Sequence, residues 1–130
     1  MRRVLVDTSA WVDFLGGVRV AVARVGKLLD EGGAVICGPV AAELLSGARS
    51  SAEYALLRDL AEGLECLPDP DGIWPRVAES RFALSRGGFR AGIVDLLIAT
   101  TALDAGVALV TRDRRFDRIR AVVPIELELF

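Results

Sequence analysis

The stretch GIVDLLIATTALDAGVALVT, residues 92–111, predicts a helix that leads directly into a strand. Its first part is apolar on successive helical turns, and residues 107–111 form a short apolar run. One carboxylate, Asp95, lies near the helix start, on the face that also carries Ile98 and Ala102. A charge on an apolar face needs a partner, and the rest of the chain indicates what that partner is.

The alternation of helix and strand extends through the whole chain. We predict strands within residues 2–9, 34–38, 64–68 and 107–111. We predict helices within residues 19–33, 39–48, 51–63, 73–88 and 92–106. Such alternation implies right-handed crossovers and a parallel sheet that is covered on both faces. The predicted fold class is therefore α/β, a three-layer α/β/α domain with a central, mainly parallel sheet.

Length and composition favour one globular domain over residues 1–130. Hydrophobic residues make up 52% of the chain and charged residues 26%, which argues against disorder. The segment PDPDG, residues 68–72, is expected to be a loop inside the domain. No apolar run reaches the roughly 18 residues of a membrane span, and the first residues turn polar too early for a secretion signal. We therefore expect a cytoplasmic location.

The two cysteines, Cys37 and Cys66, lie in apolar stretches that lack metal-binding spacing. We expect both to be buried free thiols. The formal net charge of −2 excludes a global basic field of the kind that drives indiscriminate binding to nucleic acid. Any nucleic-acid partner must therefore be bound by a local cluster of basic residues.

Four acidic residues are expected at one edge of the predicted sheet. Asp7 directly follows the first strand, and Asp113 stands two residues past the strand at 107–111. Glu43 and Asp95 lie early in the helices that begin near the same edge. In sheets of this kind, functional groups gather where the carboxyl ends of strands meet helix starts.

Each acid also has a structural interpretation. Asp7 could cap a helix that starts at Thr8 and Ser9, and Asp113 could cap a short terminal helix. Separate ion pairs with arginines could explain all four acids, although a buried carboxylate costs several kcal/mol unless it is paired. The chain contains no histidine, and Lys27 is its single lysine.

Convergence of the four acids would require a cation, because close carboxylates cannot all ionise without one. Ligands that are all hard oxygens select Mg²⁺, with Mn²⁺ as a substitute, over zinc or copper. Such an ion activates water and stabilises charge on a phosphoryl oxygen, which suits phosphodiester hydrolysis. Without histidine, the chain cannot use the paired-histidine route to RNA cleavage.

Three segments in this order carry a family resemblance: VLVDTSAWVDFL, PVAAELLSG and IVDLLIATTALDAGVALVTRDRRFDRI. The chain resembles the PIN domain over essentially its whole length, and closely resembles the VapC toxins of bacterial type II toxin–antitoxin (VapBC) systems. The resemblance implies a metal-dependent endoribonuclease that leaves 5′-phosphate and 3′-hydroxyl ends on RNA. The targets that it implies are transfer RNA or another structured RNA.

The resemblance also implies roles for individual residues. The catalytic and metal-binding acids match Asp7, Glu43, Asp95 and Asp113, with Asp7 and Asp95 as the most direct ligands of the metal. The hydroxyl positions that border the family's site match Thr8, Ser9 and Thr111, which we expect to bind the substrate. Three further acids are interpreted as surface or turn residues: Asp13, Asp104 and Asp117.

Local arginines offer a way to hold RNA. The segment 112–120 carries five arginines against two aspartates, and we predict that Arg112, Arg114 and Arg115 bind phosphates. The alternative is a solvated helix face with internal Arg–Asp pairs. A second candidate strip consists of Arg81, Arg86 and Arg90.

The resemblance implies two protein partners, a second copy of the chain in a homodimer and a cognate VapB-type antitoxin that lies along the groove. No membrane partner is expected. Apolar surface for these contacts could come from residues 22–29 and 54–64, although core packing explains most of it. Trp11 and Trp74 are both expected in the core.

Other classes of protein fit less well. A receiver domain needs a late lysine, and a haloacid-dehalogenase-type phosphatase needs Asp-x-Asp where this chain has Ser9 at the third position. The remaining alternative is a non-catalytic PIN-fold module that binds RNA or a protein. An intact set of four acids favours the enzyme.

Overall fold

A computed structural model describes residues 2–130. Five strands form one sheet in the order β3-β2-β1-β4-β5, and every neighbouring pair is parallel. The strands are β1 (Val4–Val6), β2 (Ala34–Cys37), β3 (Glu65–Leu67), β4 (Ala108–Thr111) and β5 (Leu127–Leu129). The helices are α1 (Thr8–Leu15), α2 (Arg19–Asp30), α3 (Gly38–Ser46), α4 (Ser51–Glu62), α5 (Ile73–Arg86), α6 (Ile93–Ala105) and α7 (Arg115–Ile119).

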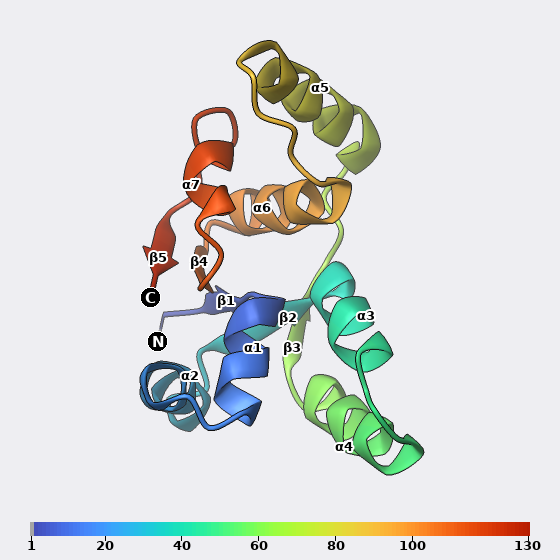
Figure 1. The fold of residues 1–130 in the computed structure, drawn as a ribbon, viewed down its shortest axis with the longest axis vertical. Coiled ribbons are helices and arrows are strands. Elements are labelled where there is room, and N and C mark those ends of the chain that lie inside the picture. Colours follow the sequence, from blue (N-terminus) through green and yellow to red (C-terminus); the bar gives the residue numbers. More distant parts are fainter. Residues whose placement is uncertain (1) are drawn as a thin grey trace.

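Helices cover both faces of the sheet. Figure 1 shows α1 to α4 on one side and α5 to α7 on the other. Right-handed crossovers require this distribution, because the chain moves outward from β1 through β2 to β3 and then returns to β4 and β5 on the opposite flank. The predicted three-layer α/β/α architecture is confirmed, and the sheet is wholly parallel.

The core explains the apolar runs of the sequence. Every residue of β1, β2 and β4 is buried, as expected for central strands covered on both faces. Helix α6 is buried over most of its surface, which accounts for its almost continuous apolar sequence. Its Thr101 hydroxyl donates to the carbonyl of Leu97 at 2.7 Å, so this polar group is satisfied inside the helix.

Helix α1 separates β1 from α2, where we predicted a strand followed by the helix of residues 19–33. The interpretation of Thr8 and Ser9 as helix starters is correct, since α1 begins at Thr8. Trp11 on this helix is fully buried, as predicted. Its ring packs edge to face on that of Phe14, with 6.1 Å between the ring centroids. A short connection then reverses the chain so that α1 and α2 pack side by side.

Two burial predictions are wrong. Trp74 is 65% exposed, because it lies on the first turn of α5 beside a shallow hollow whose walls include Pro39 and Leu97. Cys66 is exposed, because β3 is an edge strand of which only Leu67 is buried. Cys37 on the inner strand β2 is a buried thiol, as predicted, and burial raises its pKa to about 11.

The two ends of the sheet differ in character. Ion pairs lie at the amino ends of the strands, where Arg2 pairs with Glu126 and Arg3 pairs with Glu65. The predicted acids lie at the opposite, carboxyl ends. Within residues 2–130, every helix is too short or too polar to cross a membrane.

Candidate active site

The four predicted acids converge at the carboxyl edge of the sheet. Asp7 follows β1, Asp113 follows β4, Asp95 lies in the first turn of α6, and Glu43 lies in α3. The charges of Asp113, Asp7 and Glu43 all act on the Asp95 carboxyl group. Residues that are far apart in the sequence therefore lie close enough to interact electrostatically, and of the four acids Asp113 has a close ion pair, with Arg115.

Asp7 is held by two hydroxyl groups. Its side chain is 5% exposed, and Oδ2 accepts hydrogen bonds from Thr111 at 2.7 Å and from Ser9 at 3.0 Å. Asp7 occupies the N-cap position of α1, yet its side chain makes no capping hydrogen bond. The capping interpretation is therefore wrong for this side chain. Within the described residues, Oδ1 has no hydrogen-bond partner and remains available to a ligand.

The same hydroxyls connect β4 to α1. The Ser9 oxygen accepts from the backbone N–H of Arg112 at 3.1 Å, and the Thr111 oxygen accepts from that of Asp113 at 3.0 Å. On the other flank, the Thr8 hydroxyl donates to Glu43 Oε1 at 2.8 Å. All three predicted hydroxyl residues thus contact the acids, and their predicted role in binding substrate stays a prediction.

Asp95 is the least stabilised anion of the cluster. It is partly buried, and its nearest cationic group is the Arg115 guanidinium at 3.9 Å. Burial raises its pKa to about 6, and the neighbouring carboxylates of Asp113, Asp7 and Glu43 act in the same direction. Arg115 opposes this shift without cancelling it. A divalent cation bound beside Asp95 would offset both the cost of burying its charge and the repulsion from the other carboxylates.

The raised pKa of Asp95 predicts an unusual pH dependence of stability in metal-free protein. Because the folded pKa is about 6 and the unfolded pKa is about 4, folding takes up a proton between these values. The contribution of Asp95 to the free energy of unfolding therefore rises as pH falls from 7.5 to 4.5. In EDTA at pH 7.5, we expect Asp95→Asn to be more stable than the wild type by about 1–3 kcal/mol.

Urea unfolding at several pH values measures this effect. The difference between the two proteins should shrink steadily toward pH 4.5, where the wild-type carboxyl is protonated. Parallel pH profiles would contradict the assignment of the shift to Asp95. Asp113 acts in the opposite sense at lower pH, because the Arg115 hydrogen bond lowers its pKa.

Asp113 and Asp13 each bind an arginine of the basic segment. Arg115 Nη2 lies 2.6 Å from Asp113 Oδ2, and Arg112 Nε lies 2.6 Å from Asp13 Oδ2. The interpretation of Asp13 as a surface acid is wrong, because its side chain is only 13% exposed and it fixes Arg112 against α1. No pattern in the sequence indicated this pair.

The capping interpretation of Asp113 is partly correct. Its Oδ1 accepts from the backbone N–H of Arg115 at 3.0 Å, at the start of α7. The other two acids that we assigned to the surface do lie there, where Asp104 pairs with Arg76 at 2.9 Å and Asp117 pairs with Arg120 at 2.7 Å.

The arginines predicted to bind RNA differ in their freedom. Arg112 and Arg115 are held by acids, whereas Arg114 is exposed and makes no ion pair within residues 2–130. In the second strip, Arg81 donates to the carbonyl of Ala91 at 2.9 Å and is therefore a structural contact. Arg86 and Arg90 of that strip are exposed.

The donor chemistry of the cluster fits a hard divalent cation. Its ligands are carboxylate oxygens, which Mg²⁺ and Mn²⁺ prefer. In the part of the chain that the structure describes, no three acidic or thiol groups are already arranged to hold an ion. Asp113 is turned toward Arg115 and Glu43 toward Thr8, so these groups would have to move slightly to complete a coordination shell.

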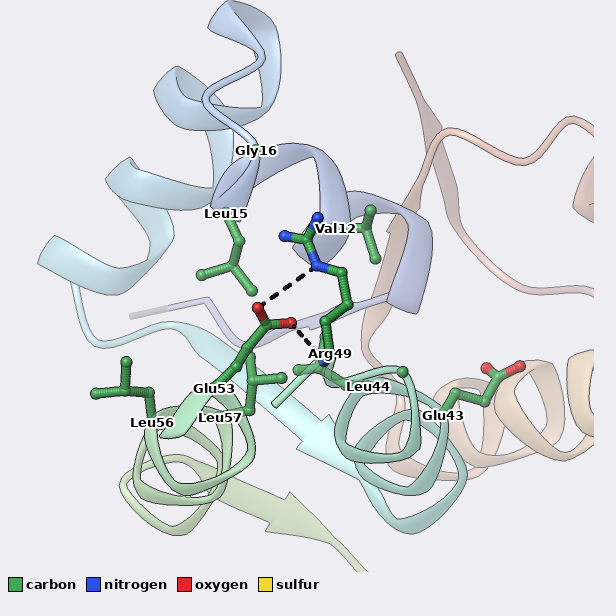
Figure 2. A pocket seen from close by; sticks show the side chains of 10 residues that line it. Val12, Leu15, Gly16, Glu43, Leu44, Arg49, Glu53, Leu56 and Leu57 are labelled. Atoms are coloured by element: carbon green, nitrogen blue, oxygen red, sulfur yellow. Dashed lines mark hydrogen bonds and ion pairs between the residues drawn. The ribbon is translucent and has the colours of Figure 1, made fainter. Parts of the chain in front are cut away.

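A groove between α1, α3 and α4 extends away from the acids. Its walls are mainly apolar and include Val12, Leu15, Leu44, Leu56 and Leu57. Figure 2 shows Glu43 at one end of this lining and Leu56 at the other, with the Arg49–Glu53 ion pair between them. The site therefore continues into a surface suited to an amphipathic segment.

Comparison with known proteins shows the family to which the chain belongs. The family model of the PIN domain matches residues 4–122. Ribonuclease VapC11 of Mycobacterium tuberculosis is 36% identical, over 98% of this chain and 98% of the relative. Ribonuclease VapC21 of the same organism is 33% identical, over 95% of this chain and 92% of the relative.

A solved structure has the same fold. A chain in the crystal structure of VapBC2 from Rickettsia felis, bound to a DNA fragment from their promoter, superposes with a TM-score of 0.78 at 21% identity. The match covers 98% of each chain. The resemblance inferred from the sequence is confirmed: the chain belongs to the PIN domain family and, within it, to the VapC ribonucleases.

Proposed function

We propose that this VapC ribonuclease cleaves RNA at the cluster formed by Asp7, Glu43, Asp95 and Asp113, with Mg²⁺ as its cofactor. The observation that carries the proposal is the state of Asp95. This carboxylate is partly buried among three others, and the single arginine near it leaves its pKa well above the ordinary value. Without a metal, the repulsion among these carboxylates lowers the stability of the fold. With a bound metal, the same carboxylates would serve as its ligands.

Asp7 and Asp95 would hold the ion directly, and Glu43 and Asp113 would complete its shell or orient the attacking water. The hydroxyls of Ser9 and Thr111 fix the Asp7 carboxylate, so that its second oxygen points to a constant position. When bound, Mg²⁺ supplies an activated water and stabilises the charge that develops on the scissile phosphate. Arg114 is exposed and no acid holds it within the described residues, so it is free to bind a neighbouring phosphate.

The proposal predicts cleavage that depends strictly on a divalent ion. In excess Mg²⁺, a fluorescently labelled structured RNA should be cut, and EDTA should abolish cutting. Mn²⁺ should restore activity, since it accepts the same oxygen ligands. Gel analysis of the labelled RNA measures both effects. RNA binding without metal-dependent cutting would instead favour the non-catalytic module.

The substrate class that we propose is transfer RNA or another structured RNA with an exposed loop. An active site on the rim of a sheet needs a strand that is accessible and unpaired. Its arginines contact phosphates, which are common to all RNA, so the choice among RNAs must depend on shape as well as on charge.

We also propose that the chain is the toxin of a type II toxin–antitoxin system in the cytoplasm, where it forms a homodimer and is inhibited by a VapB-type antitoxin. The apolar groove beside Glu43 is the proposed antitoxin surface. Of the segments expected to supply apolar contacts, much is core, but Val22, Tyr54 and Leu56 are exposed. Solved structures of the same fold include a toxin–antitoxin complex from Klebsiella pneumoniae.

A further inference from the structure

Arg115 lies between two acids of the proposed site. Its Nη2 is 2.6 Å from Asp113 Oδ2, and its Nε is 3.1 Å from each of the Asp113 oxygens. The same Nη2 is 3.9 Å from Asp95 Oδ2. One guanidinium group therefore faces both carboxylates, which flank the position where a divalent ion would bind.

The contacts of Arg115 use the same oxygens that a metal ion would need. Both carboxylate oxygens of Asp113 accept from Arg115, Oδ1 from Nε and Oδ2 from Nε and Nη2, so each is already engaged by a cation in this arrangement. Within residues 2–130 the four acids form no ready-made coordination site, and Arg115 is the group that engages Asp113.

The exposure of the three side chains shows which of them can move. Arg115 is 66% exposed, whereas Asp113 is 21% and Asp95 is 20% exposed. Arg115 is also the first residue of α7, whose buried contacts are made by Phe116 and Ile119. Its long side chain can rotate into solvent without disturbing the core, while the acids stay in place.

We propose that Arg115 is the resident counter-cation of the carboxylate cluster, and that a divalent ion must displace it from Asp113 and Asp95 in order to bind. Arg115 then stabilises the metal-free protein and lowers the affinity for metal. This inference rests on the proposed metal-dependent function, because it concerns the same acids. It makes Arg115 a positioning residue that sets the metal concentration at which the site fills.

The test is the binding of Mg²⁺ or Mn²⁺ alone to the full chain, measured by isothermal titration calorimetry. We expect Arg115→Gln to bind the ion about fivefold to tenfold more tightly than the wild type. The reason is that the substitution removes a positive charge that lies 3.9 Å from Asp95, one of the proposed metal ligands. Arg120→Gln is the matched control, because it removes the same charge from an exposed pair with Asp117 and should leave the affinity unchanged. Arg115→Lys keeps the charge without the planar fork and should fall between the wild type and Arg115→Gln.

Thermal unfolding gives a second readout that does not depend on RNA cleavage. The rise in Tm on adding Mn²⁺ should be larger for Arg115→Gln than for the wild type or Arg120→Gln. Unchanged or weaker metal affinity in a folded Arg115→Gln, with normal binding by the wild type, would overturn the inference and leave the proposed function standing. Absence of metal binding in all four proteins would contradict the proposed function itself.

Discussion

Replacing Asp95 by asparagine is expected to lower the rate of RNA cleavage on the order of 10²- to 10³-fold. The amide keeps the shape of the side chain but removes one negative charge and one strong ligand from the cluster. Within the described residues the Asp95 side chain makes no hydrogen bond, and its nearest cation, Arg115, is 3.9 Å away. The fold should therefore survive the substitution. Initial rates on a labelled RNA at matched Mg²⁺ measure the loss.

Helix α6 provides a matched control for this substitution. Asp104 lies on the same helix but pairs with Arg76 on the surface, remote from the cluster. Asp104→Asn should therefore cut RNA at nearly the wild-type rate. If Asp95→Asn also retained full activity, the four-acid mechanism would be wrong. Urea unfolding of Asp95→Asn, measured alongside the rates, shows whether unfolding contributes to the lost activity.

The largest effect on stability is expected at Trp11. Truncation to alanine should lower the free energy of unfolding by about 3–5 kcal/mol, the range for large aromatic side chains removed from a core. Trp11 is fully buried, and its ring packs edge to face on Phe14. Urea unfolding followed by circular dichroism measures the change without relying on tryptophan fluorescence.

Trp74 is the natural comparison, since it is the other tryptophan of the chain and is 65% exposed. Trp74→Ala should change the free energy of unfolding by only about 0.5 kcal/mol. Trp11→Phe should cost less than Trp11→Ala, because the ring is kept and the indole N–H, which lacks a partner in the described residues, is removed. Equal losses for the two alanine variants would refute the assignment of Trp11 to the core.

The architecture was predictable because the local signals agree with one another. Apolar runs in 34–38 and 107–111 became central strands, and helical spacing in 92–106 became the buried helix α6. The rule that parallel strands place their carboxyl ends at one edge then located the four acids. The separate helix α1 was less predictable, because its polar start resembles a turn.

Predictions failed where tertiary neighbours decide the outcome. Trp74 is exposed because of where α5 begins relative to the adjoining helices, and Cys66 is exposed because β3 is an edge strand. The Asp13–Arg112 pair joins residues from opposite ends of the chain, so no local spacing reveals it. Which arginines remain free for RNA is likewise set by such pairs.

The uniform direction of the strands has a practical consequence for handling this protein. Arg2 and Arg3 enter the sheet at the end opposite the acids, whereas the backbone N–H of Phe130 bonds to the carbonyl of Thr111, beside Asp7. An affinity label or surface tether fused ahead of residue 2 would leave the rim that carries the four acids open. The same label appended after Phe130 would crowd it, and immobilised preparations made the second way should be the less active ones.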